Sequence, residues 1–136
     1  MPIMLLDTDI LSEVLKQKHP IVGRKAVAYL AAHRQFTFSS MTRYEVVRGL
    51  KEKAAPRQLQ QFATFCGHSV ILPISESILD RAAHLWVTAR QAGTPKKDAD
   101  LIIAATALEH GLGIVTGNAI DFSWIAGLTL EDWRLP

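Results

Sequence analysis

Short apolar segments alternate with longer segments of helical periodicity along this chain. Apolar or alternating residues predict strands at residues 3–6, 36–39, 70–72 and 114–116, and a weaker strand at 128–130. Apolar residues spaced three or four positions apart predict helices at residues 9–16, 20–33, 42–50, 56–65, 75–91 and 98–110. Strands that alternate with helices predict an α/β fold, with a central parallel sheet of four to five strands and helices on both faces.

Length and composition narrow the class of protein. A chain of 136 residues is the size of one compact domain, so we expect residues 1–136 to fold as a single unit. Half of the residues are hydrophobic, but no apolar run is long enough to span a membrane. The N-terminus lacks the pattern of a signal peptide, so we expect the protein in the cytoplasm. Cys66 is the only cysteine, which excludes an internal disulfide and a zinc site built on several thiolates.

The charge balance does not by itself identify a nucleic-acid-binding protein, because the formal net charge is only +2. Basic residues gather locally, however, at Arg43 and Arg48 and again at Lys96 and Lys97. The simpler interpretation is that these side chains cover solvated helix faces. The alternative is that they contact the phosphates of a nucleic acid.

Acidic residues recur where the predicted strands end. Asp7 directly follows the first strand, and Glu45 lies on the first turn of the helix after the second strand. Asn118 and Asp121 follow the fourth strand, and Asp100 lies on the first turn of the helix before it. Because the carboxyl ends of parallel strands meet at one edge of the sheet, we expect these residues to converge there. Several oxygen ligands are what a divalent cation requires.

Each of these residues also has a purely structural interpretation. Thr42 and Glu45 have the spacing of a capping box, and Asp100 could stabilise a helix start through the macrodipole. The polar residues after the fourth strand could be ordinary turn residues. Asp7 is harder to explain in this way, because the two residues after it can cap the following helix.

The joint pattern resembles a known family. Residues 4–10 (MLLDTDI) resemble the first motif of the PIN domain, and residues 39–49 (SSMTRYEVVRG) resemble the second. Residues 100–107 (DLIIAATA) with 111–116 (GLGIVT) are similar to the third and fourth motifs. Within this family the chain resembles the VapC toxins of bacterial toxin–antitoxin pairs. Residues 127–133 (GLTLEDW) resemble the tail of the VapC toxins that cut initiator tRNA.

The resemblance implies a metal-dependent endoribonuclease in which Asp7, Glu45 and Asp100 bind Mg²⁺ or Mn²⁺. Both ions prefer oxygen ligands. A bound ion can activate a water molecule and neutralise charge on a phosphodiester, so no histidine, serine or cysteine nucleophile is needed. The expected substrate is RNA, most simply tRNA, and cutting it would inhibit translation.

The fourth acidic position departs from the family pattern. Where many PIN domains have an aspartate, this chain has Asn118, with Asp121 three residues later. Either residue could complete the metal site. The resemblance further implies that Asp9 orients the metal ligands and that Thr116 bonds the attacking water or a neighbouring carboxylate.

Partners also follow from the resemblance. VapC toxins usually form homodimers and are inhibited by a VapB antitoxin that inserts a basic side chain near the metal. The apolar segments 21–30 and 59–65 are candidates for the surfaces involved. Trp86 lies on the apolar stripe of a predicted helix, so we expect it in the core and not at a base-stacking surface.

Two other functional classes remain open from the residues. Asp7 and Asp9 match the Asp-x-Asp start of haloacid dehalogenase-like phosphatases, although this chain is short for such an enzyme. A PIN fold that binds RNA without cutting it is the second alternative, and only Asn118 favours it. A receiver-type signalling domain would need an aspartate after the third strand, where this chain has Pro73.

Overall fold

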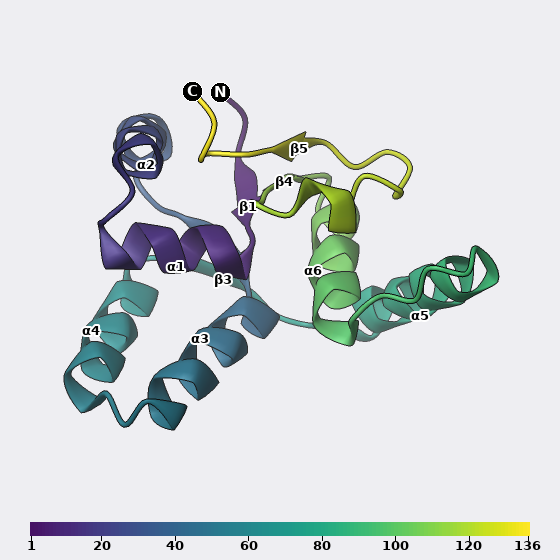
Figure 1. The fold of residues 1–136 in the computed structure, drawn as a ribbon, viewed down its shortest axis with the longest axis horizontal. Coiled ribbons are helices and arrows are strands. Elements are labelled where there is room, and N and C mark those ends of the chain that lie inside the picture. Colours follow the sequence, from purple (N-terminus) through teal and green to yellow (C-terminus); the bar gives the residue numbers. More distant parts are fainter.

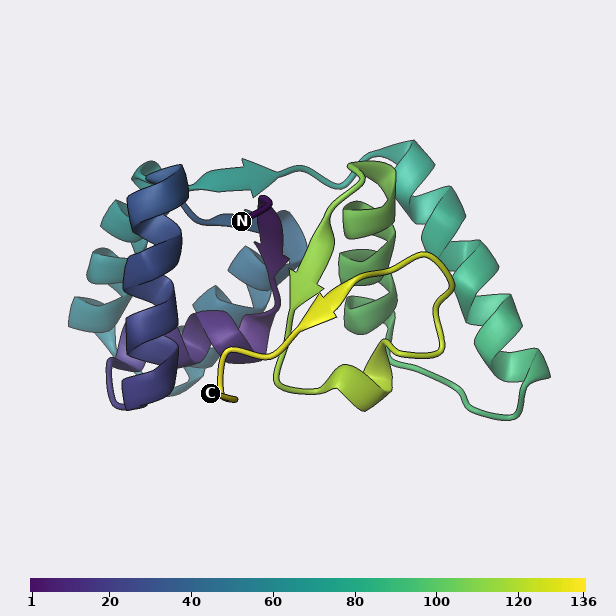
Figure 2. The same cartoon turned by 90° about the horizontal axis from the view of Figure 1, so that it is seen from above.

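Five short strands form the central sheet of the computed structural model, which describes residues 1–136. They are β1 (Met4–Leu6), β2 (Thr37–Ser39), β3 (Val70–Leu72), β4 (Gly113–Val115) and β5 (Leu130–Glu131). Neighbouring strands are all parallel, in the order β3-β2-β1-β4-β5. Figure 2 shows β1, β4 and β5 pointing in the same direction. The predicted parallel sheet is therefore confirmed.

Six α-helices and one 3-10 turn connect the strands. They are α1 (Thr8–Lys16), α2 (Pro20–His33), α3 (Ser40–Glu52), α4 (Pro56–Gly67), α5 (Glu76–Gln91), α6 (Asp98–Glu109) and the 3-10 turn η1 (Ala119–Asp121). Helices α1 to α4 lie on one side of the molecule and the α5–α6 pair lies on the other (Figure 1). None of these helices has the length and apolar character needed to cross a bilayer.

The sheet separates two hydrophobic clusters. Successive residues of a strand point to opposite faces, so Met4 and Leu6 pack with helices α1, α2 and α4, whereas Leu5 packs with α5 and α6. In the same way Val115 joins the first cluster and Ile114 the second. Helices cover both faces, as predicted.

Helix α3 begins earlier than predicted. Its N-cap is Ser39, whose hydroxyl accepts a hydrogen bond from the N–H of Met41 at 3.0 Å. The interpretation of Thr42 and Glu45 as a capping box is therefore wrong, because Thr42 lies inside the helix. A smaller difference is that β5 comprises Leu130–Glu131 instead of 128–130.

Trp86 is not part of the core, contrary to the prediction. Its side chain is 41% exposed, and the guanidinium of Arg90 lies 4.6 Å from the centre of its ring. Helix α5 packs mainly on α6 through a narrow stripe that contains Ala82 and Leu85. Because α6 is the main packing partner of α5, only one face of α5 is buried, and Trp86 does not lie on that face.

Candidate active site

Asp7 is a buried carboxylate at the carboxyl end of β1. Its Oδ1 accepts a hydrogen bond from the N–H of Thr8 at 2.8 Å, and its Oδ2 accepts one from the Thr116 hydroxyl at 2.8 Å. Asp7 is itself the N-cap of α1, so the expectation that the next two residues would cap this helix is wrong. One side chain therefore starts a helix and joins the ends of two neighbouring strands.

The surroundings of Asp7 disfavour its negative charge. Burial first, and then the nearby charge of Asp9, raise the pKa of Asp7 to about 7 against the lowering effect of its hydrogen bonds. Burial also raises the pKa of Asp9. Two acidic groups this close, with little water around them, are most stable when a proton or a cation lies between them.

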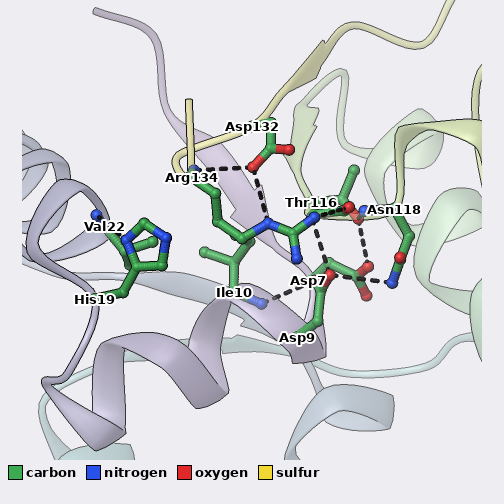
Figure 3. A network of polar contacts seen from close by, with 10 residues as sticks. Asp7, Asp9, Ile10, His19, Val22, Thr116, Asn118, Asp132 and Arg134 are labelled. Carbon is green, nitrogen blue, oxygen red and sulfur yellow. Dashed lines mark hydrogen bonds and ion pairs between the residues drawn. The ribbon is translucent and has the colours of Figure 1, made fainter. Parts of the chain in front are cut away.

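Asp9 is held by the turn that follows β4. Its Oδ2 accepts hydrogen bonds from the N–H of Gly117 at 2.9 Å and from the Asn118 amide nitrogen at 3.1 Å (Figure 3). The N–H of Asn118 in turn donates to the hydroxyl of Thr116 at 3.0 Å. Asp9 and Thr116 thus each join the end of β1 to the turn after β4.

Glu45 lies on the second turn of α3, not on the first as predicted. Its Oε1 accepts a hydrogen bond from the Thr8 hydroxyl at 2.7 Å, and the hydroxyls of Thr8 and Thr42 lie 3.1 Å apart. Arg48 lies one turn further along, with its Nη2 3.7 Å from the Glu45 Oε2. Glu45 is therefore directed to the start of α1, beside Asp7.

Asp100 joins this edge because α6 starts there. The helix precedes β4 and packs on it, so its first turn lies at the carboxyl end of that strand. Burial raises the pKa of Asp100, as do the negative charges of Asp121 and then Glu45, while Lys97 partly offsets them. The structure therefore places acidic residues from α1, α3 and η1 around Asp100.

The donor set suits a hard divalent cation. The side chains at this edge offer carboxylate and amide oxygens, with no sulfur, and the pKa values of three of the carboxyls are raised by burial. No three acidic or histidine side chains lie close enough to form a closed cage. Mg²⁺ and Mn²⁺ commonly bind in such open sites, through one or two carboxylates with water completing the shell. The residues present thus fit the implied metal.

The predicted RNA contacts lie at different distances from this site. Arg48 and Lys97 flank Glu45 and Asp100 directly. Arg43 lies near Cys66 of α4, where it partly offsets the effect of burial, which raises the pKa of the thiol. It therefore lies on the side of α3 away from Glu45, because two residues correspond to about half a helical turn. Lys96 lies in the segment before α6.

Arg134 is a residue that the sequence analysis missed. Its guanidinium donates a hydrogen bond to the Gly117 carbonyl, and its Nε lies 3.5 Å from the Oδ1 of Asp132. It follows the tail motif and belongs to no motif of its own. The signal in the sequence is Gly117, since a Cβ at this position would collide with the Arg134 guanidinium.

A groove with a volume of about 1340 Å³ runs between helices α1, α2, α3 and α4. Residues of both predicted partner segments line it, including Leu30 and Phe62. At another part of its wall lie Thr8 and Glu45. The groove therefore connects an apolar surface with the acidic edge of the sheet.

Comparison with known proteins gives one consistent result. The model of the PIN domain family matches residues 4–128. The chain is 27% identical to the tRNA(fMet)-specific endonuclease VapC of Shigella flexneri, over 95% of this chain and 96% of that protein. Its fold is similar to the DNA-bound VapBC structure from Salmonella typhimurium, with a TM-score of 0.84, 27% identity and coverage of 98% and 99% of the two chains. VapBC2 from Rickettsia felis, bound to a promoter DNA fragment, gives a TM-score of 0.83 at 26% identity over 97% and 99%.

Proposed function

This chain belongs to the PIN domain family, and from that premise we propose that it is a VapC-type toxin, a metal-dependent endoribonuclease that hydrolyses phosphodiester bonds of tRNA. The observation that carries the proposal is the buried carboxylate of Asp7, held by Thr8 and Thr116 at an edge where other acidic residues gather. A buried acid with a pKa of about 7 is costly for a structural role alone.

We assign the metal ligands to Asp7, Glu45 and Asp100, which lie on three different elements around one edge; one or two of them would contact the cation directly and the others through its water molecules. A bound divalent cation, Mg²⁺ or Mn²⁺, would supply an activated water molecule and neutralise charge on the leaving oxygen. The protein's part is to hold the carboxylates in place: Thr116 orients Asp7, and Thr8 orients Glu45. The raised pKa of Asp7 also means that metal binding has to displace a proton near neutral pH.

Asp121 is our candidate for the fourth acidic position. Its negative charge contributes to the raised pKa of Asp100, so it lies near a proposed ligand. Asn118 donates to Asp9 through its amide nitrogen, which leaves only a neutral amide oxygen to offer a cation. In this assignment Asn118 supports Asp9, and Asp121 restores the charge that an asparagine cannot provide.

The geometry does not favour the phosphatase alternative. That chemistry needs Asp9 to exchange a proton with the substrate as acid and base. Here the Oδ1 of Asp9 accepts a hydrogen bond from the N–H of Ile10 at 2.8 Å, and its Oδ2 accepts one from Gly117. Both oxygens are therefore held by backbone groups.

The substrate proposal relies on the relatives and on local charge. A relative that the chain matches over nearly its full length is named as specific for initiator tRNA, which makes this RNA the first candidate. Arg48 and Lys97 flank the acidic site and are placed to contact phosphates beside the bond that is cut. A tRNA substrate would place the protein in the cytoplasm, where residues 1–136 would act as one domain.

A VapB-type antitoxin is the partner we propose, because the similar solved structures are VapBC complexes. The groove between α1 and α4 is the surface we assign to it. A segment bound along the exposed side chains of Val27 and Leu30 could extend through the groove to Glu45, where a basic side chain could pair with the acidic residues. The homodimer implied by the family stays a prediction, which light scattering of the purified protein would test.

Cleavage of total tRNA by the purified protein, with Mg²⁺, Mn²⁺ or EDTA, tests the proposed activity. We expect cutting of one or a few tRNAs, at defined positions, only when a metal is present. Asp7→Asn should abolish it, because the amide keeps the shape of the side chain but loses the charge. Asp80→Asn, which changes an exposed carboxylate on α5, should cut like the wild type.

Two results would contradict the proposal. Equal cutting by the wild type and Asp7→Asn would indicate a contaminating nuclease or a different site. If the wild type, with every metal, bound tRNA but did not cut it, the alternative of a non-catalytic RNA-binding module would replace the proposal.

A further inference from the structure

The C-terminal segment is anchored next to the acidic site by Trp133. This side chain is 2% exposed, and its ring packs 5.5 Å from that of Tyr29 and 6.4 Å from that of Phe36, measured between centres. Its Nε1 also donates to the Oε1 of Glu131 at 3.1 Å. Because Trp133 is fixed in the core, the residue that follows it has a defined direction.

Arg134 uses this direction to reach back over the end of the sheet. Figure 3 shows its side chain extending from the C-terminal segment toward Asp9 and Asn118. Its own backbone N–H donates to the Oδ1 of Asp132 at 2.9 Å, and its Nε lies 3.5 Å from the same oxygen. Asp132 thus holds both the base and the head of the side chain, which lowers the entropy cost of its extended conformation.

The guanidinium lies against one residue of the turn after β4. It donates to the carbonyl of Gly117, and the space where a Cβ of residue 117 would stand is filled by the guanidinium itself. Gly117 does not have a positive φ, so the backbone conformation does not call for a glycine here; a side chain at this position would instead displace the guanidinium. The two residues are complementary in shape as well as in hydrogen bonding.

Gly117 is also a direct hydrogen-bond donor to the acidic site. Its N–H donates to the Oδ2 of Asp9 at 2.9 Å, and the neighbouring Asn118 amide donates to the same oxygen at 3.1 Å. Arg134 therefore binds the carbonyl side of a turn whose N–H side holds Asp9. A loss of the guanidinium would free the turn and so loosen Asp9.

We propose that Arg134 is a positioning residue, which fixes the Gly117–Asn118 turn so that this turn holds Asp9 beside Asp7. Arg134 holds the turn through Gly117, and its charge also lowers the pKa of Asp9; its hydrogen-bond and ion-pair partners, Gly117 and Asp132, include none of the proposed metal ligands. The part of this inference that concerns metal binding and cleavage rests on the proposed function. The part that concerns the turn does not.

The first test measures the turn directly, without metal or RNA. Amide hydrogen exchange of Gly117, followed by NMR on the metal-free protein, reports how well its N–H is held by Asp9. We expect Arg134→Ala to speed this exchange at least about tenfold, a change that corresponds to the loss of roughly one hydrogen bond. Arg90→Ala, which removes an exposed arginine stacked on Trp86, is the matched control and should leave Gly117 unchanged.

The second test uses a double-mutant cycle. Gly117→Ala should mimic Arg134→Ala, because the new methyl group expels the guanidinium. Each single variant should weaken Mn²⁺ binding, measured by calorimetry, by about 10- to 100-fold, as is typical when groups that orient metal ligands are lost. The double variant should bind Mn²⁺ no more weakly than the more strongly affected single variant, since both changes break the same contact. Arg134→Lys should rescue only in part, because an ammonium group lacks the planar fork of a guanidinium.

The outcomes separate this inference from the proposed function. Unchanged Gly117 exchange in Arg134→Ala would overturn the inference, whether or not the protein cuts RNA. Additive effects in the cycle, or full rescue by lysine, would also overturn it and would indicate that only the positive charge matters. If the wild type cut no RNA, the proposed function would fail, and the exchange measurement would still decide the role of Arg134.

Discussion

The two sides of the acidic site are built differently. On the side of β1 and β4, Asp7 and Asp9 accept hydrogen bonds from Thr116, Gly117 and Asn118, which are more than a hundred positions away in the sequence. On the side of α3 and α6, the acidic residues are carried on helices. Glu45 accepts one hydrogen bond there, from Thr8, and Asp100 is surrounded mainly by other charges.

This difference suggests a division of work between the two sides. Hydrogen bonds between distant segments fix the orientation of Asp7 on the side of β1 and β4, which we call the fixed side. This side can therefore define where a cation is bound. On the side of α3 and α6, side chains that are held mainly by charge can change their orientation. This adjustable side can therefore rearrange as metal and RNA bind. The comparison predicts that removing hydrogen bonds matters most on the fixed side.

The largest expected effect comes from removing one carboxylate on each side. We expect Asp7→Asn and Asp100→Asn each to lower kcat/KM for tRNA cleavage more than about a hundredfold, beyond the usual effect of losing an orienting group. Asp7→Asn should have the stronger effect on Mn²⁺ affinity, because Asp7 is already held in place by two hydrogen bonds. Calorimetric titration of both variants checks this. A stronger loss of affinity in Asp100→Asn would reverse the assignment of the two sides.

The next effect isolates a single hydroxyl on the fixed side. Thr116→Val keeps the shape of the side chain but removes the donor to Asp7 and the acceptor for Asn118. We expect about a 10- to 100-fold loss of metal affinity and cleavage.

Thr106→Val is the matched control for Thr116→Val. It removes an equally buried hydroxyl, which donates to the Ile102 carbonyl within α6 at 2.7 Å. It should change the free energy of unfolding by about 1 kcal/mol at most and leave cleavage unaffected. Similar cleavage by the two variants would mean that Thr116 has only a structural role.

The difference between local patterns and contacts between distant segments explains what could be predicted from the sequence. Strand positions followed from local apolar patterns, and the acidic residues followed from their place after those strands. Asp7, Glu45 and Asp100 could therefore be brought to one edge without knowledge of any long-range contact. The parallel sheet then determined which edge that was.

Contacts between distant segments could not be predicted in this way. Nothing near Arg134 in the sequence indicates that it binds the Gly117 carbonyl, since the two meet only when β4 and the C-terminal segment are in place. Local sequence patterns also gave a wrong prediction where two residues could serve as the N-cap of the same helix. Ser39 and Thr42 can both cap a helix, and the choice of Ser39 depends on where β2 ends. The exposure of Trp86 depends on how many helices cover α5.

The fixed side should also make the metal-free protein sensitive to pH. Because burial raises the pKa of Asp7 to about 7, the folded protein binds more protons than the unfolded chain between about pH 4 and pH 7. The free energy of unfolding should therefore fall as the pH rises through this range, by at most about 1.4 kcal/mol per pH unit from this group, and level off above it. The raised pKa values of Asp9 and Asp100 act in the same direction.

Urea unfolding in EDTA at pH 5, 6, 7 and 8 checks this expectation. Asp7→Asn should be more stable than the wild type at pH 8, and the difference should shrink toward pH 5. Asp80→Asn should follow the wild-type curve, because that carboxylate is exposed on α5. Parallel curves for the wild type and Asp7→Asn would show that the charge of Asp7 is not a source of instability.

The smallest expected effect is on the adjustable side. Thr8→Val removes the hydroxyl that donates to Glu45 at 2.7 Å and leaves the backbone N–H that donates to Asp7 in place. The Glu45 side chain is 19% exposed, so water can replace this donor, and we expect no more than about a fivefold loss of cleavage, the equivalent of about 1 kcal/mol. Thr88→Val on α5, which also replaces a threonine hydroxyl within a helix, controls for the loss of a methyl-sized polar group. A loss as large as that of Thr116→Val would mean that Glu45 is held as firmly as Asp7, and the two sides of the site would then work as one rigid unit.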